Sequence, residues 1–158
     1  MTTRVTVAGH PIHPMLVTIP IGLWVFSFIA DLVYLGTDDG RWETTAYFTL
    51  AGGLVGAIVA AVPGLLDYVG LVDQRARRIA TSHLVLNLII VAIVAVNVWL
   101  RSQPTQTMLP YLLSAVTIIA LAFSGWLGGS LVHVLGVTQP GASETAGVHG
   151  RAHTHTRP

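Results

Sequence analysis

Apolar residues fall into four long runs along most of the chain, with short polar segments between them. The runs cover roughly 14–35, 45–69, 79–100 and 108–137, and a helix needs about 20 apolar residues to cross the hydrocarbon core of a bilayer. The connecting segments GTDDGRWETT, DQRARR and RSQPTQT are short, and short connections force neighbouring helices to run antiparallel. The pattern predicts an all-α, polytopic membrane protein built as an antiparallel four-helix transmembrane bundle.

The end of the chain has a different character. Residues 139–158 are rich in Gly, Ser, Thr and His and show no apolar period. A segment of this composition cannot bury enough apolar surface to fold. We therefore expect a transmembrane domain over 1–138 and a disordered tail over 139–158.

The composition supports a membrane protein and excludes several other classes. Of 158 residues, 53% are hydrophobic and 9% charged, whereas a soluble domain carries about a quarter charged residues. Lipid is therefore the expected surroundings of the chain. A formal charge of +1 with eight dispersed arginines gives no basic patch for nucleic acid. The absence of cysteine excludes disulfides, thiolate nucleophiles and iron–sulfur ligation.

The arginines predict the orientation of the bundle. With four spans, the amino terminus, the second connection and the carboxyl terminus share one side, which carries six of the eight arginines; Arg41 and Arg101 lie on the other side. Arginine-rich segments stay in the cytoplasm, so both termini are predicted to be cytoplasmic. Basicity from arginine alone, with many Ala, Val and Gly, indicates a GC-rich bacterial genome, and hence a bacterial cytoplasmic membrane.

Four histidines outside the tail are expected at the cytoplasmic end of the bundle. His10 and His13 precede the first span, His83 lies one turn inside the third, and His133 lies about one turn before the end of the fourth. Asp67 closes the second span at the same level. His10 and His13 each precede a proline, which disfavours helical backbone, so both are expected on an irregular strap before the first helix.

One interpretation of these histidines is a b-type haem. Two imidazoles on facing helices can ligate a haem iron axially. His83 and His133 form the better pair because both lie on rigid spans at matching depth. Gly125, Gly128 and Gly129 would leave room for the porphyrin.

Two other interpretations stay open. A transition metal such as Zn, Fe, Cu or Ni can be held by His10, His13, His83 and His133, with Asp67 as a ligand or as the group that orients a ligating imidazole. Alternatively, the histidines hydrogen-bond between helices and hold no cofactor.

Polar residues also line one face of the third span. His83, Asn87, Asn97 and Arg101 fall within a narrow sector at 100° per residue. Lipid cannot satisfy their hydrogen bonds, so this face should point into the bundle. Asp31 lies near the end of the first span.

Several segments resemble a known family. They are GHPIHPMLVTIPIGLW, AAVPGLLDY, SHLVLNL, VNVWLR and SGWLGGSLVHVLGV. Together, over roughly residues 8–138, the chain resembles a bacterial family of small four-span membrane proteins known as uncharacterised-domain family 2231. The resemblance implies the fold and a membrane location and carries no activity. Relatives fused or adjacent to redox modules would fit a redox protein as partner.

The leading functional hypothesis is an integral membrane protein with a haem or metal site at its cytoplasmic end that serves electron transfer. The alternative is a cofactor-free accessory or scaffolding protein. No Ser–His–Asp or HExxH pattern occurs, so the sequence favours a non-enzymatic role and names no catalytic residue. A transporter is disfavoured because four spans are few and no repeat appears.

Overall fold

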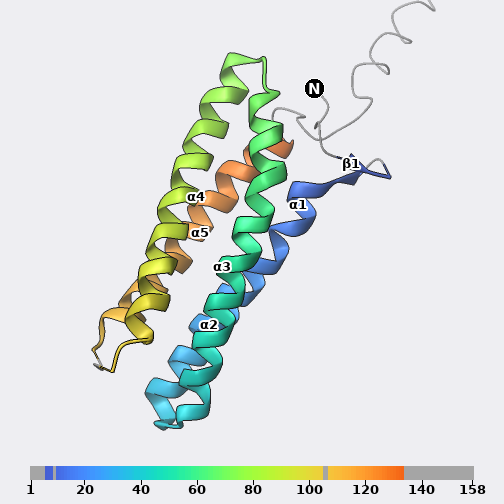
Figure 1. Cartoon of the computed structure of the whole chain (residues 1–158). Helices are drawn as coiled ribbons and strands as arrows, with labels where there is room; N and C mark the ends of the chain where they lie inside the picture. Colours follow the sequence, from blue (N-terminus) through green and yellow to red (C-terminus); the bar gives the residue numbers. More distant parts are fainter. Residues whose placement is uncertain (1–5, 9, 105–106, 134–158) are drawn as a thin grey trace, which may run out of the picture.

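The computed structural model describes residues 6–8, 10–104 and 107–133 (Figure 1). Four of its helices are long and apolar enough to cross a membrane, as the sequence predicted. The elements in chain order are β1 (Thr6–Val7), β2 (His10–Pro11), α1 (Ile12–Leu16), α2 (Thr18–Thr37), α3 (Gly40–Val69), α4 (Gln74–Arg101) and α5 (Leu109–His133). The expected end of the fourth span, 134–137, lies outside the described residues.

The helices pack as two antiparallel hairpins. The first hairpin comprises α1, α2 and α3, and the second comprises α4 and α5; α3 also packs on α4, and α2 on α5, which closes the bundle. The start of α1 and the α3–α4 connection lie at one end, called here the histidine end (Figure 1). The α2–α3 and α4–α5 connections lie at the other, called the charged end.

Helices α3 and α4 both begin about five residues before the apolar runs that predicted them. Asp39 caps α3 by accepting a hydrogen bond from the Arg41 backbone N–H at 3.0 Å. Asp73 caps α4 by accepting from the Ala76 N–H at 2.9 Å. Such caps satisfy backbone donors that a helix start leaves open, so polar turns outside the apolar run become helical.

His10 and His13 were both expected on an irregular strap before the first helix, and for His13 this prediction was wrong. His10 lies in β2, which pairs with β1 in a short antiparallel hairpin. His13, however, is helical and lies in α1. The following residue, Pro14, occupies the first turn of α1, where the missing N–H of proline has no helical acceptor to lose.

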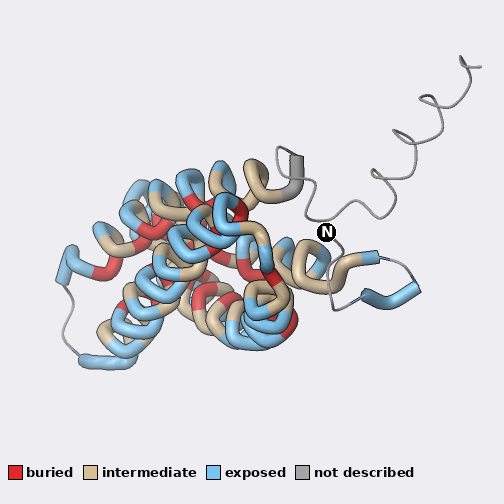
Figure 2. Tube along the Cα trace, turned by 90° about the horizontal axis from the view of Figure 1, so that it is seen from above, coloured by how far each residue is buried: buried red, intermediate tan, exposed pale blue. Residues whose placement is uncertain are grey.

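Buried positions lie where the helices face one another, and exposed positions lie on the outside of the bundle (Figure 2). Buried positions include Ala30, Ala46, Ser27 and Thr117, whereas large apolar side chains such as Phe123 are exposed. Lipid solvates an apolar exterior, and small interior residues let helices approach closely. This distribution is that of an integral membrane protein.

The largest side chain of the core crosses from α2 to α3. The Trp24 indole N–H donates to the Leu50 carbonyl at 3.2 Å. Its ring lies on Gly53, where an added Cβ would come well inside van der Waals contact with the indole nitrogen. The close packing of α2 on α3 therefore depends on a glycine at this position.

We predict that Gly53→Ala lowers the stability of the bundle by about 1–3 kcal/mol, the usual cost of overpacking a core. Thermal unfolding in detergent, followed by circular dichroism, measures this. Gly22→Ala is the matched control, because nothing lies within 4 Å of a Cβ at Gly22. Equal melting temperatures for the two variants would contradict the assigned packing.

Candidate functional site

Two of the sequence-predicted residues, His13 and His83, hydrogen-bond to a neighbouring helix through a ring nitrogen. They come from α1 in the first hairpin and α4 in the second. Both residues lie at the histidine end of the bundle (Figure 1).

The His13 ring is held on α3. Its Nδ1 donates to the Ala60 carbonyl at 2.8 Å. A Cβ added at Gly64 would stand 2.7 Å from both Nδ1 and Cε1 of this ring. The ring can therefore occupy this position only because residue 64 is a glycine. Pro63 lies between these two contacts and interrupts the hydrogen-bond ladder of α3.

The His83 ring is held on α5 in the same manner. Its Nδ1 donates to the Ser124 carbonyl at 3.0 Å. A Cβ added at Gly128 would lie 3.2 Å from its Cε1. Asn87, one turn along α4, donates to the His83 carbonyl at 2.7 Å and to the Ser124 hydroxyl at 2.8 Å.

These two contacts settle the proton position on each neutral ring. A backbone carbonyl only accepts hydrogen bonds, so Nδ1 must carry the hydrogen in both His13 and His83. The lone pair of each neutral ring then resides on Nε2. Each imidazole is thus held in one orientation by a donor bond and a glycine surface on the neighbouring helix of its own hairpin.

The glycines proposed to make room for a porphyrin have different surroundings. Gly128 is already covered by the His83 ring, whereas a Cβ at Gly125 or Gly129 would meet nothing within 4 Å. The space beside Gly128 therefore belongs to an imidazole in this structure.

The other predicted ligands come from β2, α3 and α5. His10 is exposed, and its Nδ1 bonds to the Ala8 carbonyl at 3.0 Å within the amino-terminal hairpin. Asp67 is partly buried near the end of α3, and the side chain of His133 lies outside the described residues. Within the described part of the chain, no three His, Asp or Glu side chains are grouped to hold a metal ion.

A second cluster lies at the charged end, where a buried ion pair joins the two hairpins. Arg101 Nη2 donates to Asp31 Oδ2 at 2.7 Å, and the two side chains are 5% and 1% exposed. Arg101 also donates to Asn97 Oδ1 at 3.1 Å and to the Ser114 hydroxyl at 3.2 Å. Asn97 in turn donates to the Pro110 carbonyl at 3.0 Å. The inward face predicted for α4 is confirmed here.

Sequence reasoning missed the pairing itself. Both members were identified as polar residues in apolar spans, but not as partners. The antiparallel order of the helices places the ends of α2 and α4 at the same end of the bundle. This order was the feature of the sequence from which the pairing could have been predicted. An acid and an arginine on different spans at equal depth are expected to pair.

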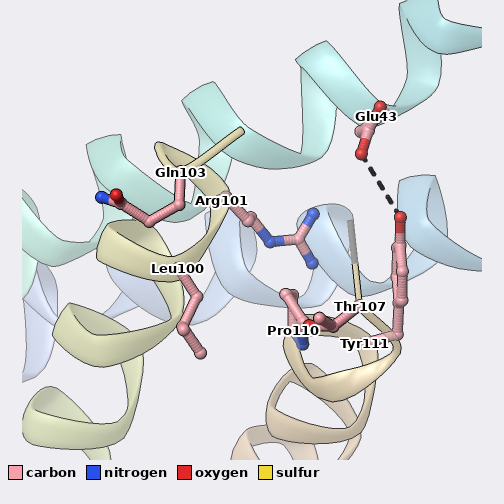
Figure 3. A pocket seen from close by; sticks show the side chains of 7 residues that line it. All are labelled: Glu43, Leu100, Arg101, Gln103, Thr107, Pro110 and Tyr111. Atoms are coloured by element: carbon pink, nitrogen blue, oxygen red, sulfur yellow. Dashed lines mark hydrogen bonds between the residues drawn. The ribbon is translucent and has the colours of Figure 1, made fainter. Parts of the chain in front are cut away.

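Tyr111 extends this cluster to α3. The Arg101 guanidinium carbon lies 5.3 Å from the centre of the Tyr111 ring, and the Tyr111 hydroxyl donates to Glu43 Oε1 at 3.3 Å. Tyr34 stacks on Tyr111 with ring centres 6.0 Å apart. A cavity of about 40 Å³ opens beside these groups (Figure 3), lined by Glu43, Leu100, Arg101, Gln103, Thr107, Pro110 and Tyr111. It has room for a few water molecules.

Comparison with known proteins identifies the family and no further function. The model of the family described as "Predicted membrane protein (DUF2231)" matches residues 9–141. The chain belongs to the DUF2231 family. No curated protein and no solved structure matches it. The resemblance drawn from the sequence is thereby confirmed, and the function of this DUF2231 protein has to be inferred from its own geometry.

In this DUF2231 protein, Arg101→Met should lower stability by about 3–5 kcal/mol, because it leaves Asp31 as an uncompensated buried charge. The double variant Asp31→Leu/Arg101→Met removes both charges and should be more stable than the single one. Thermal unfolding in detergent compares them.

Arg41→Met is the control for that comparison. The Arg41 side chain is 88% exposed and pairs with Asp39 on the surface, so its loss should leave the melting temperature nearly unchanged. A single Arg101→Met variant as stable as wild type would show that the buried pair does not contribute as described.

Proposed function

We propose that this integral membrane protein binds a b-type haem through His13 and His83 at the histidine end and takes part in electron transfer. The observation that carries the proposal is the pair of Nδ1 hydrogen bonds, from His13 to Ala60 and from His83 to Ser124. Metal-ligating histidines almost always donate their other ring N–H to a carbonyl, a carboxylate or water. Both rings already have this arrangement.

The placement of the two residues on different hairpins also supports the proposal, since His13 and His83 would hold the haem between them. Each is anchored within its own hairpin, so the imidazoles belong to different halves of the bundle. Membrane cytochromes of the b type use two histidines from facing helices. We propose His13 in place of His133 because His13 and His83 each donate Nδ1 to a backbone carbonyl of the neighbouring helix.

Haem is favoured over a bare metal ion by the number of ligands that each needs. Structural and catalytic transition-metal sites take three or four protein ligands, and no group of three is found among the residues that the structure describes. An iron held by four porphyrin nitrogens needs only two. Bound haem would supply a one-electron carrier, and the expected partner is a redox protein at the predicted cytoplasmic surface.

A cofactor-free scaffold is the second candidate function, and the same hydrogen bonds favour it. Each ties two helices of a hairpin at a position where lipid offers no partner. On this hypothesis, the imidazoles complete the fold, and the protein acts through its surface.

Absorption spectroscopy separates the two candidates. Protein purified without chelators from haem-supplied cells should show a Soret band, and His13→Ala and His83→Ala should each abolish it. His10→Ala is the matched control, since His10 is exposed and bonds only within its hairpin, and it should keep the band.

Circular dichroism confirms that each variant remains helical. A colourless wild-type protein would reject the haem proposal and leave the scaffold. A band lost in His133→Ala but kept in His13→Ala would reject the present pair in favour of the one predicted from the sequence.

A further inference from the structure

We propose that Arg77 and Arg78, in the first turn of α4, form a binding site for the phosphate of an anionic phospholipid. Both side chains are exposed, and they lie at the histidine end of the bundle, next to the α3–α4 connection (Figure 1). The hydrogen bonds of the histidine pair involve neither arginine. The proposal concerns lipid binding and does not depend on haem.

The side chains around this site offer hydrogen-bond donors and no carboxylate. An open hollow of about 320 Å³ is lined by Gln74, Arg77, Arg78 and Thr81. Two of these side chains are guanidiniums, which stay charged at physiological pH and match the oxygens of a phosphate. Gln74 adds the two N–H donors of its amide. The lining is therefore suited to an anion with several acceptor oxygens.

Arg77 is held in position by contact with α3. Its guanidinium carbon lies 5.7 Å from the centre of the Tyr68 ring. The Thr81 hydroxyl donates to the Arg77 carbonyl at 2.7 Å, so the Tyr68 hydroxyl is the donor in its 3.0 Å hydrogen bond with Thr81. This bond fixes the ring on which the guanidinium lies. A guanidinium that is positioned in advance loses less conformational entropy when it binds a ligand.

The charge of both guanidiniums is available for a ligand. Within the described part of the chain, both ion pairs lie at the charged end, and neither involves Arg77 or Arg78. Residues 67–78 carry three arginines and two aspartates, and the Asp73 carboxylate is engaged as the cap of α4. The surroundings of the hollow therefore have an excess of positive charge, which attracts an anion.

The position of the two arginines along α4 matches the depth of lipid phosphates. The stretch 79–100, which follows them, contains no Asp, Glu, Lys or Arg. At 1.5 Å per residue, this stretch covers the roughly 30 Å of a hydrocarbon core. Tyr68 lies one residue before the end of α3, at the level where aromatic side chains meet the headgroups. Arg77 and Arg78 are therefore expected among the phosphates of the adjoining leaflet.

An apolar surface continues from the site along the same face of α4. Val85 and Leu88 lie two turns further along the helix than Arg78 and Thr81 respectively, and both are exposed. A lipid whose phosphate lies at the arginines can extend an acyl chain along this surface. A free phosphate would use the arginines alone. The continuity of the two surfaces favours a lipid as the occupant.

The headgroup is expected to be anionic rather than zwitterionic. The ammonium of a zwitterionic headgroup would meet two guanidiniums and no carboxylate in the lining, and like charges in contact are unfavourable. A glycerol headgroup adds hydroxyl groups without a positive charge. Phosphatidylglycerol is therefore the appropriate probe, with phosphatidylcholine as the zwitterionic comparison.

Native mass spectrometry of the delipidated full-length protein in detergent tests this site by titration with each lipid. We expect phosphatidylglycerol to bind more tightly than phosphatidylcholine. Arg77→Met and Arg78→Met should each weaken the binding of phosphatidylglycerol about fivefold, the effect of one basic residue at an anionic lipid surface. The binding of phosphatidylcholine should stay unchanged in both variants.

Arg75→Met is the matched control. Arg75 lies in the same turn of α4 and is also exposed, but it does not line the hollow. The variant removes the same charge from the same end of the protein. It should leave the affinity for phosphatidylglycerol nearly unchanged.

Three results would overturn the proposal. One is equal affinity of wild type for the two lipids. Another is an equal loss of affinity in Arg75→Met, Arg77→Met and Arg78→Met, which would show a general attraction of anionic lipid to positive charge. The third is displacement of phosphatidylglycerol by millimolar inorganic phosphate at constant ionic strength, which would assign the arginines to a free anion. Because the substituted side chains are exposed, circular dichroism should show wild-type helicity in all three variants.

Discussion

The hydrocarbon core of a bilayer offers no hydrogen bonds, and this constraint governs how the helices of this protein meet. Three ring N–H donors cross to a backbone carbonyl of a neighbouring helix and lie on a glycine about one turn further along it. The donors are Trp24, His13 and His83, over Gly53, Gly64 and Gly128 respectively. The glycine allows the ring to approach, and the carbonyl satisfies the donor. The same contact therefore provides packing and polar satisfaction together.

The two ends of the bundle use this constraint differently. At the histidine end, His13 and His83 each tie helices within one hairpin through a neutral donor. At the charged end, the Asp31–Arg101 pair crosses between hairpins. A buried ion pair adds little net stability but is costly to break, so it constrains how the hairpins dock. The Nε2 lone pairs of His13 and His83 lie at the histidine end, which is where we place the proposed haem site.

The sequence predicted the number of spans and their antiparallel order because run length and loop length determine both. It also predicted that Asn97 and Arg101 face inward, since lipid cannot satisfy them. Helices α3 and α4 begin before their apolar runs, because capping by Asp39 and Asp73 extends each helix into polar residues.

The sequence did not predict the hydrogen-bond partners of the polar side chains. Periodicity along one helix gives the face of a residue but not the rotation and depth of the neighbouring helices. The pairing of Arg101 with Asp31, and the carbonyls that receive His13 and His83, depend on that rotation and depth.

Nuclear magnetic resonance of isotope-labelled histidine nitrogens in nanodiscs tests the central claim most directly, with signals assigned by His13→Ala and His83→Ala. We predict that both rings, when neutral, carry their hydrogen on Nδ1; a hydrogen on Nε2 of either ring would contradict the account.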